Sequence, residues 1–128
     1  MSKKDILLPK DIDNIEYFSE FNEDKIGKTI CAFLNTKGGY IVVGATSYEN
    51  IIGIVLEKDY KEIELEISKN IVPKSLVSFE FNEKEKLLII EVPSGKDFPY
   101  SFKNDIFVRV ADTNQKADNY TIRDMVMR

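Results

Sequence analysis

Residues 26–45, IGKTICAFLNTKGGYIVVGA, constrain the fold of this chain more than any other stretch. The first part repeats apolar side chains at three- and four-residue steps, which predicts an amphipathic helix. Gly38 and Gly39 follow, and paired glycines supply the positive φ angles that a chain reversal needs. Residues 40–43 are then continuously apolar and β-branched, as in a strand buried on both faces. The segment therefore predicts a helix, a tight turn and a central strand packed together, with the helix burying Ile26, Ile30, Phe33 and Leu34.

The remaining hydrophobic pattern predicts strands and helices in mixed order. We expect a first strand over 16–21 that puts Glu16, Phe18 and Glu20 on one face, and a helix start at Asn22. Asp59 and Thr121 are the expected caps of two later helices. The predicted strands are 51–54, 76–81, 86–92 and 106–110, the later helices are 60–71 and 119–128, and 46–50 is a polar hairpin loop. This order indicates an α+β fold, a sheet with helices packed on it.

Length and charge limit what the chain can do. Its 128 residues suit one domain, 1–128, and because the sequence stops inside a helical pattern it also suits the N-terminal module of a longer protein. A net charge of −4 excludes binding to nucleic acid by bulk charge, so any phosphate-binding surface is a local patch. The chain has no histidine, and Cys31 is its single cysteine, placed within the apolar helix, so we expect a buried structural thiol.

No segment has the length and composition of a membrane span or of a secretory signal. The first eleven residues contain only a three-residue apolar run, and no apolar run approaches the roughly 18 residues that a span requires. We therefore expect a soluble, cytoplasmic protein without a membrane partner.

Four ordered motifs resemble the Schlafen AlbA_2 family. Residues 32–45, AFLNTKGGYIVVGA, are similar to its signature AFANTxGGxLxxGV. Glu20-Phe21 resembles an early E-F-K strand, and Gly53-Ile54 resembles the G-I that closes its hairpin. Pro99-Tyr100 and the run FVRVAD at 107–112 resemble its P-Y and Y-V-R-V-G-S segments. The resemblance covers residues from about 14 to 118 and implies a mixed sheet packed with two to three helices.

The resemblance implies two functions. In bacterial and archaeal transcription regulators the domain precedes a winged-helix region and is taken to bind DNA, whereas in Schlafen proteins it cleaves structured RNA with three carboxylates around a divalent ion. The sequence has no P-loop, so nothing supports nucleotide hydrolysis. Alba-like folds often pair, so the resemblance also makes a homodimer plausible.

The three carboxylates of the nuclease relatives are only partly present. Ile15 stands where the first acid is expected, Glu20 matches the second, and Thr46-Ser47 replaces the acidic pair that supplies the third. Glu16 would replace the first acid if a β-bulge turned its side chain inward, and Glu49 would replace the third acid if its loop rearranged. Because one carboxylate binds a divalent ion poorly, we expect no metal site and no cofactor, with a divalent metal required only if the domain is a nuclease.

Basic residues define the candidate nucleic-acid surface. They lie on the predicted helix, at the glycine turn and around the last strand: Lys25, Lys28, Lys37, Lys103, Arg109 and Lys116. Val108 and Val110 are expected to be buried, with Phe107 and Arg109 on the other face. An Arg beside an aromatic on a sheet can contact phosphate or bases, but Arg109 can equally pair with Asp105, Asp112 or an early glutamate. Likewise the turn amides either face a phosphate or only cap the helix.

We therefore expect a non-catalytic nucleic-acid-binding domain of the transcription-regulator type, with DNA favoured over RNA by the resemblance alone. One alternative is a divergent metal-dependent RNA endonuclease that uses Glu16, Glu20 and Glu49. The second alternative is a protein-interaction or dimerisation domain.

Overall fold

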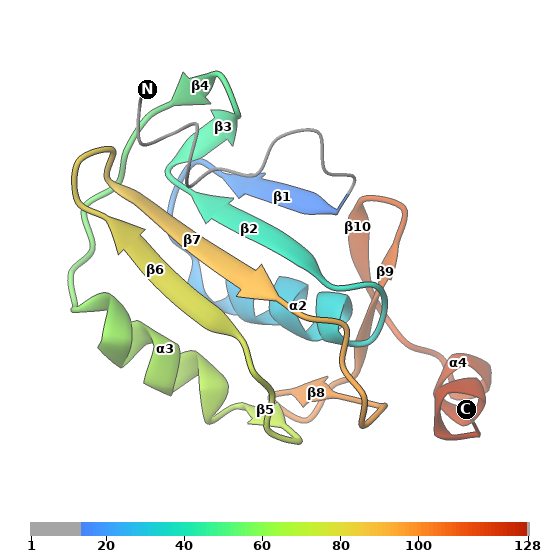
Figure 1. Ribbon diagram of the computed structural model, residues 1–128. Coiled ribbons are helices and arrows are strands. Elements are labelled where there is room, and N and C mark those ends of the chain that lie inside the picture. The colour runs from blue at the N-terminus through green and yellow to red at the C-terminus, as the bar shows by residue number, and fades with distance from the viewer. Residues whose placement is uncertain (1–13, 128) are drawn as a thin grey trace.

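The computed structural model describes residues 14–127 and has an α+β fold, in which a mixed four-stranded sheet carries helices on one face (Figure 1). The strand order is β1-β2-β7-β6, with β1 parallel to β2 and the other neighbours antiparallel. The described elements are, in order, β1 (Ile15–Phe18), α2 (Glu23–Leu34), β2 (Gly39–Val43), β3 (Ala45–Ser47), β4 (Asn50–Ile51), α3 (Tyr60–Ser68), β5 (Ile71–Val72), β6 (Ser78–Asn82), β7 (Leu87–Val92), β8 (Ser101–Phe102), β9 (Phe107–Val110), β10 (Thr113–Lys116) and α4 (Asn119–Val126).

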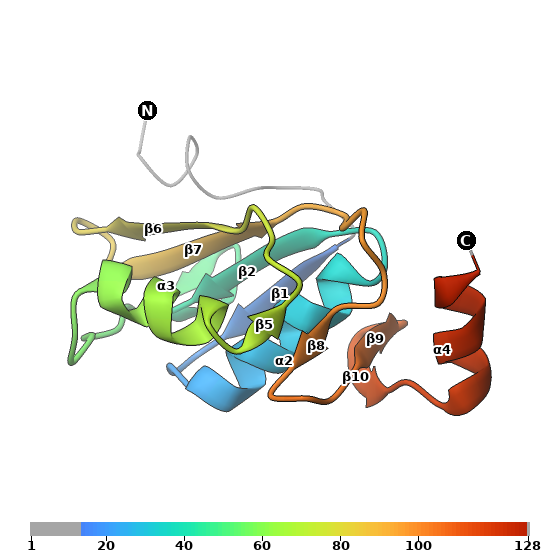
Figure 2. The same cartoon turned by 90° about the horizontal axis from the view of Figure 1, so that it is seen from below.

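Helices α2 and α3 lie beneath the sheet, and the short pairs β5–β8 and β9–β10 complete that layer (Figure 2). Helix α4 stands beside the β9–β10 pair, away from the sheet, in both views (Figures 1 and 2). No helix in residues 14–127 is long and apolar enough to cross a bilayer.

The predicted helix, turn and strand of residues 26–45 form the centre of the molecule. The four apolar residues predicted for the helix face are all buried. Ile41 and Val43 of β2 point into the main core beneath the sheet, whereas Val42 belongs to a second cluster on the opposite face, with Ala45, Leu87 and Ile89. The prediction of a strand buried on both faces is confirmed, because successive side chains of a strand alternate between faces.

The two glycines of the turn are required for different reasons. Gly38 has φ +75°, and a Cβ there would also lie 2.6 Å from the Val92 carbonyl oxygen. Gly39 does not have a positive φ, so that part of the prediction is wrong. A Cβ on Gly39 would lie 2.5 Å from the Asn14 carbonyl oxygen and 3.0 Å from the Phe33 ring. Gly38 is therefore needed for conformation and Gly39 for close approach.

Several predicted boundaries are wrong where tertiary contacts override local pattern. Strand β1 ends at Phe18, so Glu20 lies in a bend beyond it and does not share a strand face with Glu16. Helix α3 ends at Ser68, and Ile71 instead pairs with Phe102 in β5–β8. The strand predicted over 51–54 is limited to Asn50–Ile51, and the loop predicted over 46–50 is largely the β3–β4 pair.

The helix caps follow the predictions at two of three ends. Asn22 and Asp59 cap α2 and α3 through their side-chain oxygens. The cap of α4 is Asp118, whose carboxylate accepts from the Thr121 amide, so the assignment to Thr121 was off by three positions. That hydrogen bond lowers the pKa of Asp118.

Candidate nucleic-acid interface

Four of the six predicted basic residues gather around the first half of α2. Lys25 and Lys28 lie on that helix, one turn apart. The Lys28 Nζ lies 3.0 Å and the Lys103 Nζ 3.9 Å from the two carboxylate oxygens of Asp24, so this aspartate joins them. Lys116, at the end of β10, pairs in register with Phe107, and the Lys28 Nζ lies 5.6 Å from the centre of the same ring. We call Lys25, Lys28, Lys103 and Lys116 the lysine cluster.

Two aspartates partly neutralise the lysine cluster. Asp24 contacts Lys28 and Lys103, and the Asp105 carboxylate lies 3.5 Å from the Lys116 Nζ. All these side chains are about 40% exposed or more, so each pair is held weakly and can exchange for another anion. Lys25 has no ion-pair partner within residues 14–127. The cluster therefore keeps an excess of exposed positive charge.

Lys37 lies apart from this cluster. It follows the other end of α2, and a helix of 12 residues is about 18 Å long. Its side chain is exposed. Three amides of the turn are already used, because Asn35 N donates to Cys31 O and the amides of Thr36 and Gly38 both donate to Phe33 O. These bonds favour the helix-cap interpretation of the glycine turn over a phosphate site.

Arg109 faces the interior of the protein. Its Nη2 donates to Glu16 Oε1, its Nη1 donates to Asn114 Oδ1 at 2.6 Å, and its guanidinium carbon lies 5.1 Å from the centre of the Phe33 ring. Only 10% of its side chain is exposed. The expectation that Val108 and Val110 are buried is wrong, since Val108 is only half-buried and Val110 is 47% exposed, while Phe107 and Arg109 turn toward α2.

The same network links three elements through polar side chains. Asn114 of β10 accepts from Arg109 and donates to Thr29 Oγ1 at 2.8 Å, and Thr29 in turn donates to the Lys25 carbonyl oxygen. Glu16 on β1, Arg109 and Asn114 on the hairpin, and Thr29 on α2 are thereby joined. Asn114 was not predicted from the sequence, because β10 has no apolar alternation that would mark it as a strand.

The three candidate nuclease carboxylates have separate positions. Glu16 sits in an unbroken β1–β2 register opposite Ile41, so the β-bulge considered for it is absent. Glu20 is exposed in the bend after β1, and Glu49 is exposed in the β3–β4 turn. In the described range 14–127, no three Asp, Glu or Cys side chains are grouped so that they could hold a metal ion.

The two hydroxyl residues at the position of the third nuclease acid stabilise a turn. Thr46 Oγ1 accepts from the Asn50 side-chain amide, and Ser47 Oγ accepts from the Asn50 backbone amide at 3.2 Å. Both residues are exposed in β3. Their visible role is therefore to hold the β3–β4 hairpin.

Asn35 is the most densely bonded side chain of the signature segment 32–45, although the sequence predicts only a turn residue at this position. It is buried, its Nδ2 donates to the carbonyl oxygens of Tyr100 (2.9 Å) and Phe107 (2.8 Å), and its Oδ1 accepts from the Tyr100 amide (2.7 Å). Tyr100 is buried as well, and its hydroxyl accepts from the Lys96 and Asp97 amides. The signature segment 32–45 and the Pro99-Tyr100 motif, which are far apart in the sequence, are thus joined by buried hydrogen bonds. We call the bonds from Asn35 to Tyr100 and Phe107 the clamp.

Cys31 is buried in α2, as predicted, and lies beside this clamp. Desolvation raises the pKa of its thiol to about 11, and a smaller contribution from the Phe107 backbone lowers it. We expect the thiol to resist a disulfide reagent at pH 8 in the folded protein, because roughly one thiol in a thousand is then ionised. Labelling followed by absorbance should be slow in buffer and complete within the mixing time in denaturant; rapid labelling of the folded chain would contradict the buried position.

Comparisons with known proteins agree with this architecture. The family described as Schlafen, AlbA_2 matches residues 10–118. The crystal structure of the DIP2311 protein from Corynebacterium diphtheriae is similar in fold, with a TM-score of 0.65 at 20% sequence identity over 86% of this chain. The chain spans 23% of the length of that protein. No curated protein matches in sequence. The chain belongs to the Schlafen AlbA_2 family.

Proposed function

We propose that this domain is a non-catalytic nucleic-acid-binding module of the transcription-regulator type, with duplex DNA as its preferred ligand, and that the lysine cluster is the contact surface. Membership of the Schlafen AlbA_2 family supports a nucleic-acid-binding type of domain. The observation that carries the proposal is the convergence of four lysines from α2, the end of β8 and β10 on one surface of an otherwise acidic chain.

The cluster suits phosphate better than bases. Its aromatic neighbours, Phe102 and Phe107, are buried beneath Lys103 and Lys28 and present no ring face on which a base could stack. Lysines act as exposed point charges that can exchange Asp24 and Asp105 for phosphate oxygens. The proposal therefore includes backbone contact with little sequence readout from this surface. A homodimer stays a prediction and is not needed for these contacts.

The test is the salt dependence of binding to a duplex DNA and to a hairpin RNA, measured by fluorescence anisotropy. Four phosphate contacts give a slope of about −3 to −4 in a plot of log K against log salt between about 50 and 200 mM. Lys25→Glu/Lys28→Glu should weaken binding at least about tenfold at low salt and reduce the slope by about 2. The control Lys61→Glu/Lys84→Glu changes the net charge equally at exposed sites outside the cluster and should have little effect.

Three results would count against the proposal. Equal weakening by both charge-reversed pairs would show bulk electrostatics without a defined surface. If neither the duplex DNA nor the hairpin RNA binds at low salt, the result would favour the protein-interaction function instead. Cleavage of a hairpin RNA with Mn²⁺, lost in Glu20→Gln, would establish the nuclease function in place of a non-catalytic one.

A further inference from the structure

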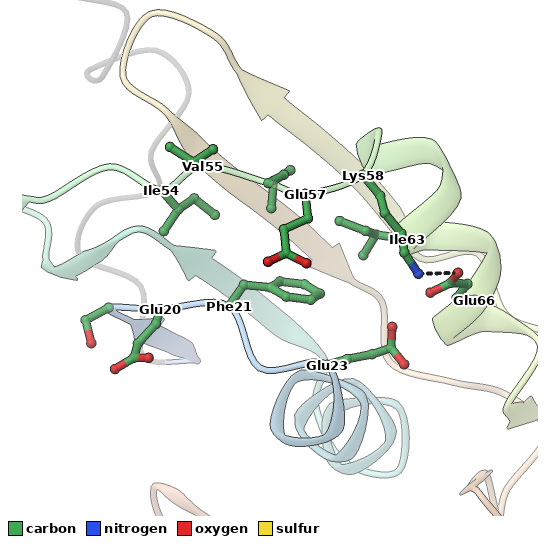
Figure 3. A pocket seen from close by; sticks show the side chains of 11 residues that line it. Glu20, Phe21, Glu23, Ile54, Val55, Glu57, Lys58, Ile63 and Glu66 are labelled. Atoms are coloured by element: carbon green, nitrogen blue, oxygen red, sulfur yellow. Dashed lines mark hydrogen bonds and ion pairs between the residues drawn. The ribbon is translucent and has the colours of Figure 1, made fainter.

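A pocket of about 480 Å³ lies between the start of α2, helix α3 and the segment 54–58 that leads into α3 (Figure 3). This volume falls within the range of about 300–1,000 Å³ that small-molecule sites occupy. Its middle is apolar, formed by Phe21, Ile54 and Ile63. This pocket is separate from the lysine cluster and has the opposite charge.

Carboxylates surround the apolar middle from three different elements. Glu23 comes from α2, Glu66 from α3 and Glu57 from the connecting segment, and Glu20 lies at the far end beside Phe21 (Figure 3). Glu20, Glu23 and Glu57 have no ion-pair partner within residues 14–127. The pocket lining therefore has a surplus of negative charge over a surface that can hold hydrocarbon.

The protein's own Lys58 shows which chemistry the pocket favours. Its Nζ lies 2.7 Å from Glu66 Oε1, across the side of the pocket (Figure 3). The pKa of Lys58 is raised by Glu66 first, with further contributions from Glu23 and Glu62. An ammonium group is thus already held at this rim by one carboxylate, that of Glu66, within the negative field of Glu23 and Glu62.

The spacing of the carboxylates selects an extended organic cation over a metal ion. In the described part of the chain, no three of the carboxylates come together as a metal site would require. A divalent ion needs its oxygens converging at about 2.0–2.6 Å, whereas charges set along an apolar trough match ammonium groups separated by methylene chains.

We propose that this pocket binds an aliphatic ammonium group, either of a free polyamine or of a lysine side chain of a partner protein. The methylene chain packs on Phe21, Ile54 and Ile63, and the ammonium groups pair with Glu23 and Glu57 beside the Lys58–Glu66 pair. This site shares no residue with the lysine cluster, and Glu20 at its far end lines a smaller neighbouring pocket together with Lys25.

Calorimetric titration of the whole chain with spermidine tests the proposal. Glu57→Gln is expected to weaken spermidine binding roughly three- to tenfold, and Lys58→Met to strengthen it by about threefold, because one removes and the other adds net negative charge at the pocket. Glu80→Gln is the matched control, because it changes the net charge as Glu57→Gln does but lies exposed on β6, outside the pocket lining. Circular dichroism establishes that each variant is folded.

Two further probes identify the source and the limits of the interaction. A blocked lysine amide that binds more tightly than spermidine, with the same response to Glu57→Gln, assigns the site to a protein side chain; tighter spermidine binding assigns it to a free polyamine. Hexanediol carries no charge and should bind at least about tenfold more weakly than either. Equal binding of hexanediol, equal effects of Glu57→Gln and Glu80→Gln, or no spermidine binding would each overturn the proposal.

Discussion

Replacing Asn35 with alanine is expected to lower the free energy of unfolding by about 3–5 kcal/mol, the largest effect of any single substitution considered for this chain. The substitution removes the side-chain partner of the Tyr100 amide, and it leaves the carbonyl oxygens of Tyr100 and Phe107 with only the weak Cys31 thiol as a side-chain donor. Each buried group left unpaired costs about 1–3 kcal/mol. Because a domain of this size has a total stability of about 5–15 kcal/mol, much of the margin would be lost.

Urea unfolding followed by circular dichroism measures this loss. Asn50→Ala is a suitable control, because Asn50 also donates a side-chain hydrogen bond but is exposed in the β3–β4 turn, and it should cost no more than about 0.5 kcal/mol. A loss below about 1 kcal/mol for Asn35→Ala would mean that water or a backbone shift satisfies the three groups, and the clamp would not be a main support of the fold.

Asn35→Asp separates the donor and acceptor roles of this side chain. The carboxyl can still accept from the Tyr100 amide, but when ionised it faces two carbonyl oxygens. Burial and these oxygens raise the pKa of the introduced carboxyl in the folded state. The folded variant then binds more protons than the unfolded one, so its stability relative to the parent should fall as pH rises above about 4. A difference that is constant with pH would contradict this arrangement.

Glu16→Ala is expected to cost about 2–3 kcal/mol, whereas Glu20→Ala should cost less than about 0.5 kcal/mol. Glu16 pairs with Arg109, whose side chain is only 10% exposed, so its removal leaves a partly buried guanidinium without its counter-ion. The estimate lies below that for a fully buried pair because Glu16 is 27% exposed. Glu20 lies in an exposed bend and has no such partner within residues 14–127.

A double substitution checks the cause of the Glu16 effect. Glu16→Leu/Arg109→Met replaces both charges with apolar groups and should be less destabilising than the sum of the two single changes. Thermal unfolding and DNA affinity are both measured, because a purely structural Arg109 predicts that folded Arg109→Met keeps the affinity of the parent. Loss of DNA binding without loss of stability would instead place Arg109 in the interface.

The first strand shows where sequence reasoning succeeded and where it failed. Its existence and its parallel position beside β2 are compatible with its apolar and aromatic residues, but its end was predicted three residues late. Ser19 and Glu20 are compatible with a strand by composition, and pairing stops because the neighbouring strand β2 ends at Val43, the partner of Phe18. A partner strand therefore sets a boundary that local propensity does not mark.

The candidate site divides in the same way. The sequence identifies the four lysines of the lysine cluster, and the alternatives for Arg109 included an early glutamate. Which alternative holds depends on Arg109 and Glu16 meeting across 93 positions of chain. The acid-lined pocket was missed altogether, because its carboxylates are separated in the sequence and each looks like an ordinary solvated charge.

By itself, the sequence determined the central helix, the turn and the buried strand of residues 26–45, the burial of Cys31 and the family, because apolar spacing and glycine placement are local properties. Only the tertiary structure decided that Asn35 is a clamp, that Arg109 is a buried partner of Glu16, and that lysines and glutamates collect on different surfaces. Those properties depend on which distant side chains meet, and that is set by strand register and helix packing across the whole core.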